Sequence, residues 1–229
     1  MKLVVQDVAT LLKVSEKVVH RWIAQRGLPA HRVNDQYRFN RTELLEWATA
    51  NRVPISVAML KEDRPGELPG LAEALEAGGI HYRVAGKDKL SLLTEVVRLM
   101  PLPQEVDRAF LLDVLVTRES LGSTGIGNGV AIPHIRNPIV LHIPRPMISL
   151  CFLDDPVDFD AVDRQPVHTL FAIVSPTIRG HLHLLSRLSF ALSQPAFKEA
   201  VARPALREEV LRRAGEVDRM IETAPDARG

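Results

Sequence analysis

The chain has 229 residues, which is long enough for one large domain or for two smaller domains that each bury a core. A hydrophobic content of 46% and a charged content of 25% are ordinary for a soluble globular protein, and no apolar run approaches the roughly 20 residues that span a bilayer. Because the N-terminus carries charges where a signal peptide needs an apolar stretch, we expect a cytoplasmic protein. The single cysteine, Cys151, excludes an intrachain disulfide and a cysteine-based zinc cluster.

The net charge of +1 is unevenly distributed along the chain. Residues 1–52 hold nine Lys and Arg against five Asp and Glu, a net of +4, so the remaining residues carry −3. We therefore expect a polyanionic partner to meet the N-terminal end.

Changes in composition divide the chain into four parts. A compact, basic domain with a helical pattern is expected at residues 1–50, and a linker that mixes Pro, Gly and charge is expected at 51–67. In residues 68–215 helical apolar stripes alternate with strand-like runs, which predicts an α/β domain. The polar residues 216–229 are expected to form a flexible tail.

The first domain has the pattern of a helix-turn-helix. A short helix at about 6–12 is followed by a tight turn at 13–14, and Ser15 is a favourable N-cap for a second helix over 16–25, which Gly27 ends. The apolar residues of this second helix predict one buried stripe, made of Val18, Val19, Trp22 and Ile23.

Two short strands with a turn at Asn34–Asp35 follow and predict a wing. Asn40, with Glu43 three residues later, gives a capping-box-like start to a third helix.

This order of helix, turn, helix, LPA, wing and helix resembles the excisionase-type winged helix-turn-helix family over about 45 residues. The resemblance implies that the second helix enters the major groove of DNA while the wing touches the backbone or the minor groove. The alternative is a protein-interaction module with a solvated basic face. The implied DNA contacts are Glu16, Lys17, His20 and Arg21 in the helix and Arg32, Gln36 and Arg38 in the wing.

In the larger domain, helices are expected at 68–79, 87–100, 105–120 and 181–192, with two short helices after them. A strand is expected at 80–84 and a short one at 130–132. The runs at 147–153 and 167–174 are continuously apolar and of strand length, which predicts central strands buried on both faces.

The glycine-rich stretch TRESLGSTGIGNGVAIPHIR, residues 117–136, combines a basic residue, hydroxyls, glycines and a histidine. Glycines let backbone N–H groups approach an anion closely. The stretch is neither a dinucleotide fingerprint, because Val130 stands where the third glycine belongs, nor a Walker A loop, because Asn128 replaces the lysine. We therefore expect no nucleotide cofactor, but a loop that can hold a phosphoryl group beside an imidazole.

Here the sequence resembles the IIA proteins and domains of the phosphotransferase system, of the fructose, mannitol and nitrogen-regulatory type. Four blocks occur in the family's order within about residues 68–215: RES at 118–120, GSTGIGNGVAIPH at 122–134, DFDAVDRQPV at 158–167, and HLHLLSRLS with its preceding proline at 176–189.

The resemblance implies an α/β fold with a mixed sheet flanked by helices. It also implies that His134 accepts the phosphoryl group, that His181 is the second active-site histidine and that Arg118 contacts the phosphoryl oxygens.

The chemistry of these side chains agrees with the implied roles. A neutral imidazole, with an ordinary pKa of about 6.5, is nucleophilic at pH 7 and needs no dedicated base. Arg118 offers a planar charged fork, and Ser123 and Thr124 offer hydroxyls and N–H groups to phosphoryl oxygens. His181 could hydrogen-bond the phosphoryl group or fix the tautomer of His134.

Each of these residues also has an ordinary structural explanation. His134 could be a surface turn residue, His181 a core histidine, and Arg118 a cation that complements a helix C-terminus. His183 is expected to be solvated. A zinc site of His134, His181 and His183 lacks a fourth ligand in the motif, so we expect no metal.

The sequence thus predicts a regulator whose IIA domain exchanges phosphate with an HPr-like carrier and whose DNA binding, as a homodimer, depends on that phosphate. Two alternatives stay open. The IIA domain could be a phosphate-independent dimerisation or sensing module of a DNA-binding protein, or the chain could be a plain phosphocarrier whose N-terminal module binds protein.

Overall fold

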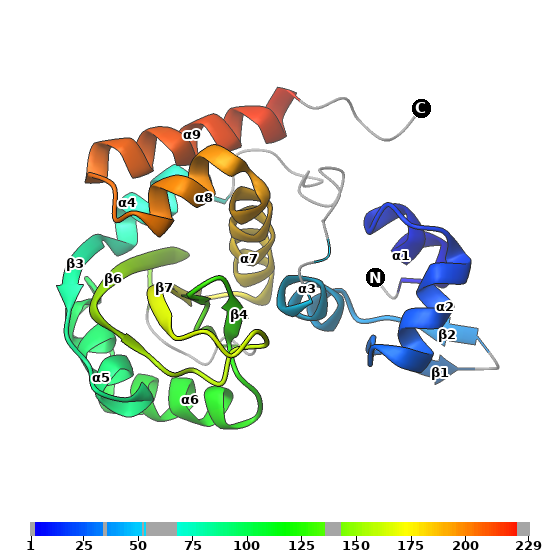
Figure 1. The fold of residues 1–229 in the computed structure, drawn as a ribbon, viewed down its shortest axis with the longest axis horizontal. Coiled ribbons are helices and arrows are strands. Elements are labelled where there is room, and N and C mark those ends of the chain that lie inside the picture. The colour runs from blue at the N-terminus through cyan, green and yellow to red at the C-terminus, as the bar shows by residue number, and fades with distance from the viewer. Residues whose placement is uncertain (1–2, 34–35, 52, 54–67, 136–142, 224–229) are drawn as a thin grey trace.

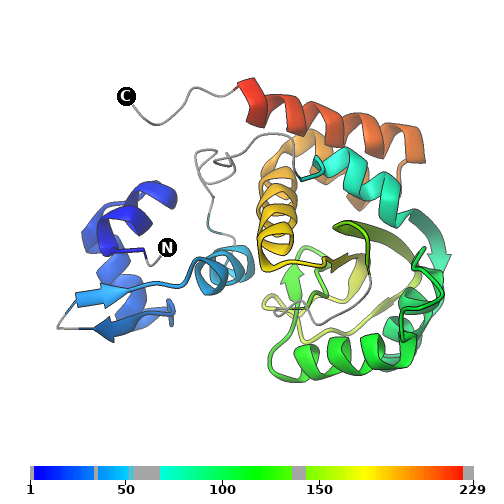
Figure 2. The ribbon, with the colours of Figure 1, turned by 180° about the vertical axis from the view of Figure 1, so that it is seen from behind.

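The computed structural model describes residues 3–33, 36–51, 53, 68–135 and 143–223. Figure 1 shows two bodies: an N-terminal domain of helices with a two-stranded sheet, and a larger α/β domain. Helix α3 of the N-terminal domain lies between them, against helix α7 of the larger domain, in both views (Figures 1 and 2).

The N-terminal domain has the predicted elements in the predicted order. They are α1 (Val5–Leu11), α2 (Glu16–Gln25), β1 (His31–Val33), β2 (Gln36–Arg38) and α3 (Arg41–Ala50). Lys13 and Gly27 adopt positive φ angles of 53° and 63°, which turns the chain sharply before and after α2. The two strands pair antiparallel as a wing, and the turn predicted at Asn34–Asp35 lies outside the described residues.

Buried apolar side chains from all three helices fill this domain, among them Val8, Val19, Leu44 and Leu45. Trp47 of α3 packs on Trp22 of α2 with the ring centroids 5.3 Å apart, and its indole N–H donates to the carbonyl of Arg26 at 2.9 Å. These contacts fix α3 to the helix-turn-helix. Ser15 has extended N-cap dihedrals, but its side chain makes no capping hydrogen bond.

The larger domain is built on a five-stranded mixed sheet in the order β3-β6-β7-β5-β4. The strands are β3 (Ile80–Val84), β4 (Gly125–Gly127), β5 (Val130–Ala131), β6 (Met147–Val157) and β7 (Val167–Val174). The two central strands, β6 and β7, are buried along most of their length, as their continuous apolar runs predict.

Helices cover both faces of this sheet, and each face has its own hydrophobic core. The helices α4, α7, α8 and α9 pack on one face, whereas α5 and α6 pack on the other (Figure 1). Their bounds are α4 (Leu71–Gly78), α5 (Lys89–Leu99), α6 (Arg108–Ser120), α7 (Ile178–Ser193), α8 (Pro195–Ala202) and α9 (Arg207–Thr223). None of the described helices is both long and apolar enough to cross a membrane.

Several helices differ in their bounds from the expectation: α4 begins at Leu71 rather than at residue 68, and α7 begins at Ile178 rather than at His181. Helix α6 begins at Arg108 rather than at Glu105, because the Asp107 carboxylate caps it by accepting from the N–H of Phe110 at 3.0 Å. Helix α9 is long and extends to Thr223, well into the segment expected to be a flexible tail.

Buried contacts explain the length of α9. Its residues Val217 and Ile221 are almost fully buried. The Asp218 carboxylate accepts from the first N–H groups of α4, those of Leu71 at 2.8 Å and Ala72 at 3.0 Å, and pairs with Arg187 at 2.6 Å. The many charged residues of α9 therefore belong to a helix that packs against α4, at the start of the larger domain.

Candidate active site

His134 lies where the chain leaves β5 and passes beside β7. The N–H of Ile173 in β7 donates to the carbonyl of Pro133 at 2.9 Å and fixes the backbone there. The His134 Nδ1 lies 2.7 Å from the carbonyl oxygen of Ile132. Because a carbonyl only accepts, Nδ1 carries the proton of that hydrogen bond, and the nitrogen directed away from it is Nε2. The residue is 4% exposed.

His181 stacks on His134, with the ring centroids 5.1 Å apart and the planes inclined by 27°. It sits in the first turn of α7, which Thr177 caps by accepting from the N–H of Gly180 at 3.0 Å. Burial, then the neighbouring charges of His134 and Arg118, lower the pKa of His181 to about 3, against an opposing influence of Glu46. His181 is therefore a neutral imidazole at physiological pH.

Arg118 occupies the last turn of α6, and its guanidinium donates from Nη1 to the carbonyl of Gly122 at 2.8 Å. This bond ties Arg118 to the first glycine of the loop that leads to His134. Its charge lies close enough to His181 to lower the pKa of that imidazole. The three residues implied as the phosphotransfer site thus belong to one neighbourhood.

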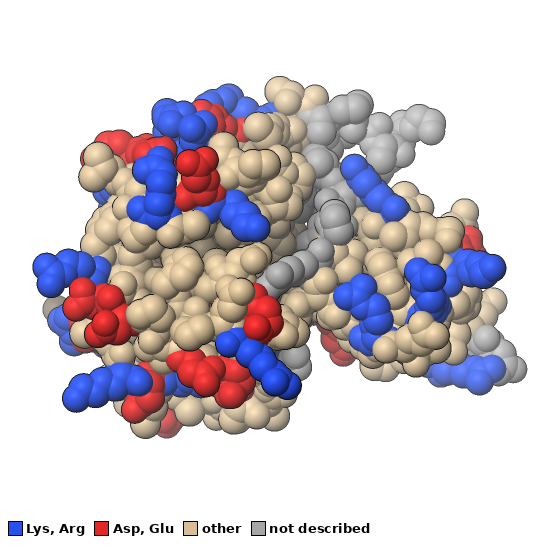
Figure 3. Space-filling view, in the orientation of Figure 1, with Lys and Arg blue, Asp and Glu red and all other residues tan. Residues whose placement is uncertain are grey.

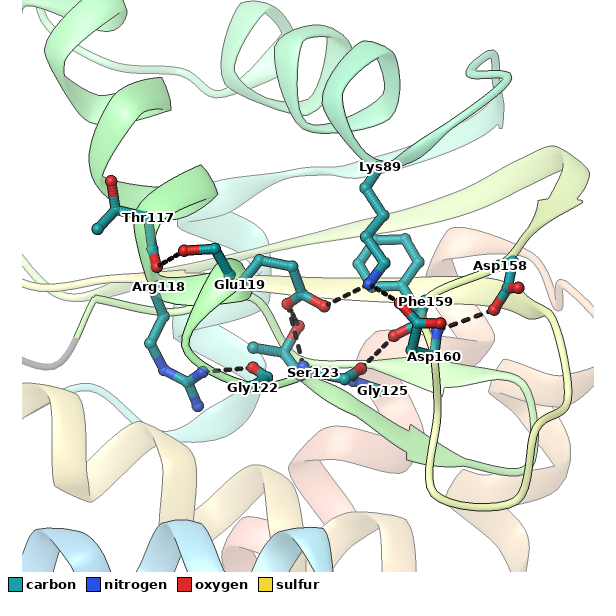
Figure 4. A network of polar contacts seen from close by, with 12 residues as sticks. Lys89, Thr117, Arg118, Glu119, Gly122, Ser123, Gly125, Asp158, Phe159 and Asp160 are labelled. Atoms are coloured by element: carbon teal, nitrogen blue, oxygen red, sulfur yellow. Dashed lines mark hydrogen bonds and ion pairs between the residues drawn. The ribbon is translucent and has the colours of Figure 1, made fainter.

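A buried carboxylate, Glu119, organises the loop between α6 and β4 (Figure 4). One of its oxygens, Oε2, accepts from the backbone N–H of Thr124 at 3.0 Å and from the Thr124 hydroxyl at 2.6 Å. The other, Oε1, pairs with Lys89 at 3.4 Å, and Lys89 in turn pairs with Asp160 at 2.7 Å. Glu119 lies inside the RES block, but sequence reasoning gave it no role.

Ser123 and Thr124 were expected to contact phosphate, and the structure places both hydroxyls within the loop. The Ser123 hydroxyl donates to the carbonyl of Phe159 and accepts from the N–H of Gly125 at 2.9 Å (Figure 4). The Thr124 hydroxyl donates to Glu119. Both hydroxyls stabilise the loop conformation in this state, and their contact with phosphate stays a prediction.

The fourth side chain at the site comes from the N-terminal domain. Helix α3 places Glu46 with Oε1 3.5 Å from Nε2 of His134, and Glu46 is 8% exposed. Sequence reasoning missed this residue, since the motif of the larger domain gives no signal for a carboxylate that another domain supplies.

Glu46, His134 and His181 each offer a ligand atom within 4.8 Å of the others, an arrangement that could hold a divalent cation. Two imidazoles and one carboxylate form a ligand set that zinc accepts. His183, the third residue of the zinc site considered from sequence, instead directs Nε2 to the carbonyl of Pro69 at 2.8 Å. It is 8% exposed, so the expectation of a solvated side chain was wrong.

The residues expected to contact DNA lie on the surface of the N-terminal domain. Figure 3 shows Lys and Arg side chains on the visible face of this domain. Arg38 is partly buried and donates to the Gln36 side chain at 2.9 Å. The exposed members of the set are Glu16, Lys17, His20, Arg21, Arg32 and Gln36.

Comparison with known proteins assigns both domains. Residues 73–213 match the family described as "Phosphoenolpyruvate-dependent sugar phosphotransferase system, EIIA 2". The chain belongs to this family. Residues 3–52, ahead of the IIA domain, match a helix-turn-helix domain family.

Relatives of the IIA domain include nitrogen regulatory proteins. That of Pseudomonas aeruginosa is 38% identical over 128 residues, which cover 54% of this chain and 80% of the relative. That of Escherichia coli K12 is 37% identical over 110 residues, which cover 47% of this chain and 64% of the relative. The crystal structure of nitrogen regulatory protein IIA-Ntr from Neisseria meningitidis, 32% identical, aligns with a TM-score of 0.55 over 63% of this chain and 98% of that one. The predicted mixed sheet flanked by helices is thereby confirmed.

Proposed function

We propose that this protein is a cytoplasmic regulator whose IIA domain accepts a phosphoryl group on His134 from an HPr-like carrier, and whose DNA binding depends on that phosphate. The observation that carries the proposal is the position of α3. A helix of the DNA-binding domain contributes Glu46 to the surroundings of His134 Nε2, at 3.5 Å. Chemistry at His134 therefore acts directly on the element that supports the helix-turn-helix.

The transfer is a displacement at phosphorus. The lone pair of His134 Nε2 attacks the phosphorus of the donor's phosphohistidine, the donor's N–P bond breaks, and its electron pair returns to the donor imidazole. The Nδ1–H bond to Ile132 is kept throughout and holds the ring in one orientation. Such a transfer needs positioning and charge stabilisation. We therefore assign Arg118 to bind the phosphoryl oxygens and the neutral His181 to form a hydrogen bond with the phosphoryl group.

The nitrogen-regulatory relatives support a regulatory role over a sugar-committed one. One winged domain offers few base contacts, so specific DNA recognition calls for a homodimer. The rival assignments, a phosphate-independent sensing module and a plain phosphocarrier, make different predictions for the experiments below.

Phosphorylation should weaken DNA binding. The phosphoryl group adds about −1.5 to −2 charges, taking phosphoserine as the guide. Placed at Nε2 it would repel Glu46, and the DNA-binding domain would lose its fixed position on the IIA domain. The measurement is titration of duplex DNA with the phosphorylated and unphosphorylated protein at one salt concentration, together with sedimentation of both. Equal affinities and equal sedimentation would favour the phosphate-independent module.

A double Arg21→Ala and Arg38→Ala variant should bind every DNA sequence more weakly. Each lost phosphate contact should reduce the slope of log affinity against log salt by roughly 0.9 on B-DNA. Arg98→Ala is the matched control, because Arg98 is an exposed arginine of the IIA domain that pairs with Glu95. An affinity unchanged by the double substitution, or no DNA binding at low salt, would favour the protein-binding phosphocarrier.

A further inference from the structure

Helix α3 has two partners. Trp47 packs on Trp22 in the N-terminal domain, while Glu46 and Thr49 reach the IIA domain. Glu46 and Thr49 are three residues apart and so share one face of the helix. Glu46 meets His134, and the Thr49 hydroxyl lies 2.6 Å from the hydroxyl of Ser189 in α7. The helix therefore covers the phosphorylation site while it supports the helix-turn-helix.

The contact between Thr49 and Ser189 is made by groups that already have partners. The Thr49 hydroxyl lies 2.8 Å from the carbonyl of Leu45, and the Ser189 hydroxyl lies 2.7 Å from that of Leu185. Each hydroxyl has one hydrogen to donate, so the two hydroxyls cannot donate to Leu45, to Leu185 and to each other at the same time. When α3 leaves, both hydroxyls keep their helical carbonyl acceptors, so separation breaks little hydrogen bonding.

A hollow also lies beside this contact. Next to Thr49, α3 and the IIA domain line a partly open pocket of about 270 Å³. Its apolar lining includes Ala48 and Val53 from the N-terminal side, and Ile126, Val130 and Leu192 from the IIA domain. The apolar side chains around this hollow make fewer contacts across the interface than they would in a closed protein core.

The docked position is incompatible with phosphotransfer. The donor's phosphorus must approach Nε2 in line with the bond that breaks, and Glu46 Oε1 is 3.5 Å from that nitrogen. His134 is 4% exposed with α3 in place, so a donor protein cannot reach it from solvent.

We propose that α3 is an intramolecular competitor of the phosphoryl donor: it occupies the surface on which the donor protein must dock, so that docking of α3 and phosphorylation of His134 exclude one another. The inference rests on the proposed function and specifies its regulation. The phosphoryl donor gains access only to the undocked fraction of molecules, and the phosphoryl group then prevents α3 from returning.

A disulfide lock tests the proposal. Thr49→Cys with Ser189→Cys places two thiols where two hydroxyl oxygens lie 2.6 Å apart, and thiol titration verifies that the disulfide has formed before the rates are compared. The native Cys151 is fully buried and stays inert. The oxidised protein should accept phosphate from phosphoenolpyruvate, enzyme I and HPr at least about tenfold more slowly than the same protein after reduction, because the rate follows the competent fraction. Equal rates before and after reduction would overturn the proposal.

The opposite change should accelerate phosphorylation. Thr49→Arg replaces the hydroxyl that contacts Ser189 by a long cation beside a largely apolar pocket, where burial of its charge is unfavourable, and should raise the initial rate above that of the wild type. Glu43→Arg is the matched control on the same helix, since Glu43 pairs with His31 inside the N-terminal domain at 3.0 Å. A Thr49→Arg protein no faster than the Glu43→Arg protein would count against competition by α3.

Failure of the proposed function has a different signature. In that case none of these proteins is phosphorylated, whether reduced, oxidised or undocked. Docking is then read from the maleimide reactivity of a Thr49→Cys thiol. His134→Glu sets a carboxylate against Glu46 and should raise the reactivity, whereas the neutral His134→Gln should not. Equal reactivity in the two backgrounds would show that charge at this position does not displace α3.

Discussion

The His134→Ala protein should take up no phosphate from phosphoenolpyruvate, enzyme I and an HPr-like carrier. Nε2 of His134 is the nucleophile in the proposed transfer, whereas His181, in the first turn of α7, is assigned to a hydrogen bond with the phosphoryl group and not to accepting it. The phosphate on the wild-type protein should be labile in acid and stable in alkali, as an N–P bond is.

The measurement is incorporation of labelled phosphate, with the folded state checked by thermal melting. His168→Ala is the matched control, since His168 is half-buried and hydrogen-bonds Thr169 outside the site. We expect the control to be phosphorylated like the wild type. Incorporation of label into the His134→Ala protein would show that another residue accepts the phosphoryl group.

Arg118→Ala and His181→Ala should each be phosphorylated, but about 10²–10³ times more slowly, the loss seen when one preorganised donor to a developing charge is removed. Arg118 supplies a fixed charge from the end of α6. His181 is neutral at physiological pH, so its contribution should not change between pH 6 and pH 8.

Single-turnover transfer from phosphorylated HPr separates this effect from docking of the donor. Arg118→Lys keeps the charge but not the planar guanidinium group. It should recover only part of the wild-type transfer rate, because an ammonium group cannot reproduce two parallel N–H donors. A wild-type transfer rate in Arg118→Ala or in His181→Ala would remove that residue from the site.

Much of the fold could be predicted from the sequence, because local signals and tertiary packing agree. The bounds of α2, β3 and β7 coincide with the predicted segments, whose ends were placed from an N-cap residue type, from glycines and from an unbroken apolar run. Prediction failed where a distant partner decides the structure. Helix α9 carries many charges and was assigned in part to a tail, yet hydrogen bonds from the start of α4 to Asp218 stabilise its C-terminal half.

The same distinction applies to the candidate site. His134, His181 and Arg118 were named from motifs of the IIA domain, and the structure brings them together. Glu46 was not named, because its position depends on how two domains pack, and no spacing within the helix-turn-helix encodes that. The hydroxyls of Ser123 and Thr124 were judged by their chemistry alone, whereas the fold gives them nearer partners in Phe159 and Glu119.

The contact between Asp218 and the start of α4 has a consequence for synthesis on the ribosome. The last helix of the N-terminal domain ends at Ala50, whereas the first turn of α4 receives its carboxylate cap only after residue 218 has been made. While the residues between α3 and Asp218 are being made, therefore, a finished helix-turn-helix domain precedes an unfinished IIA domain. The surface that α3 packs on is formed by α7 and β4, so the two domains can pack together only after α7, which ends at Ser193, has been made.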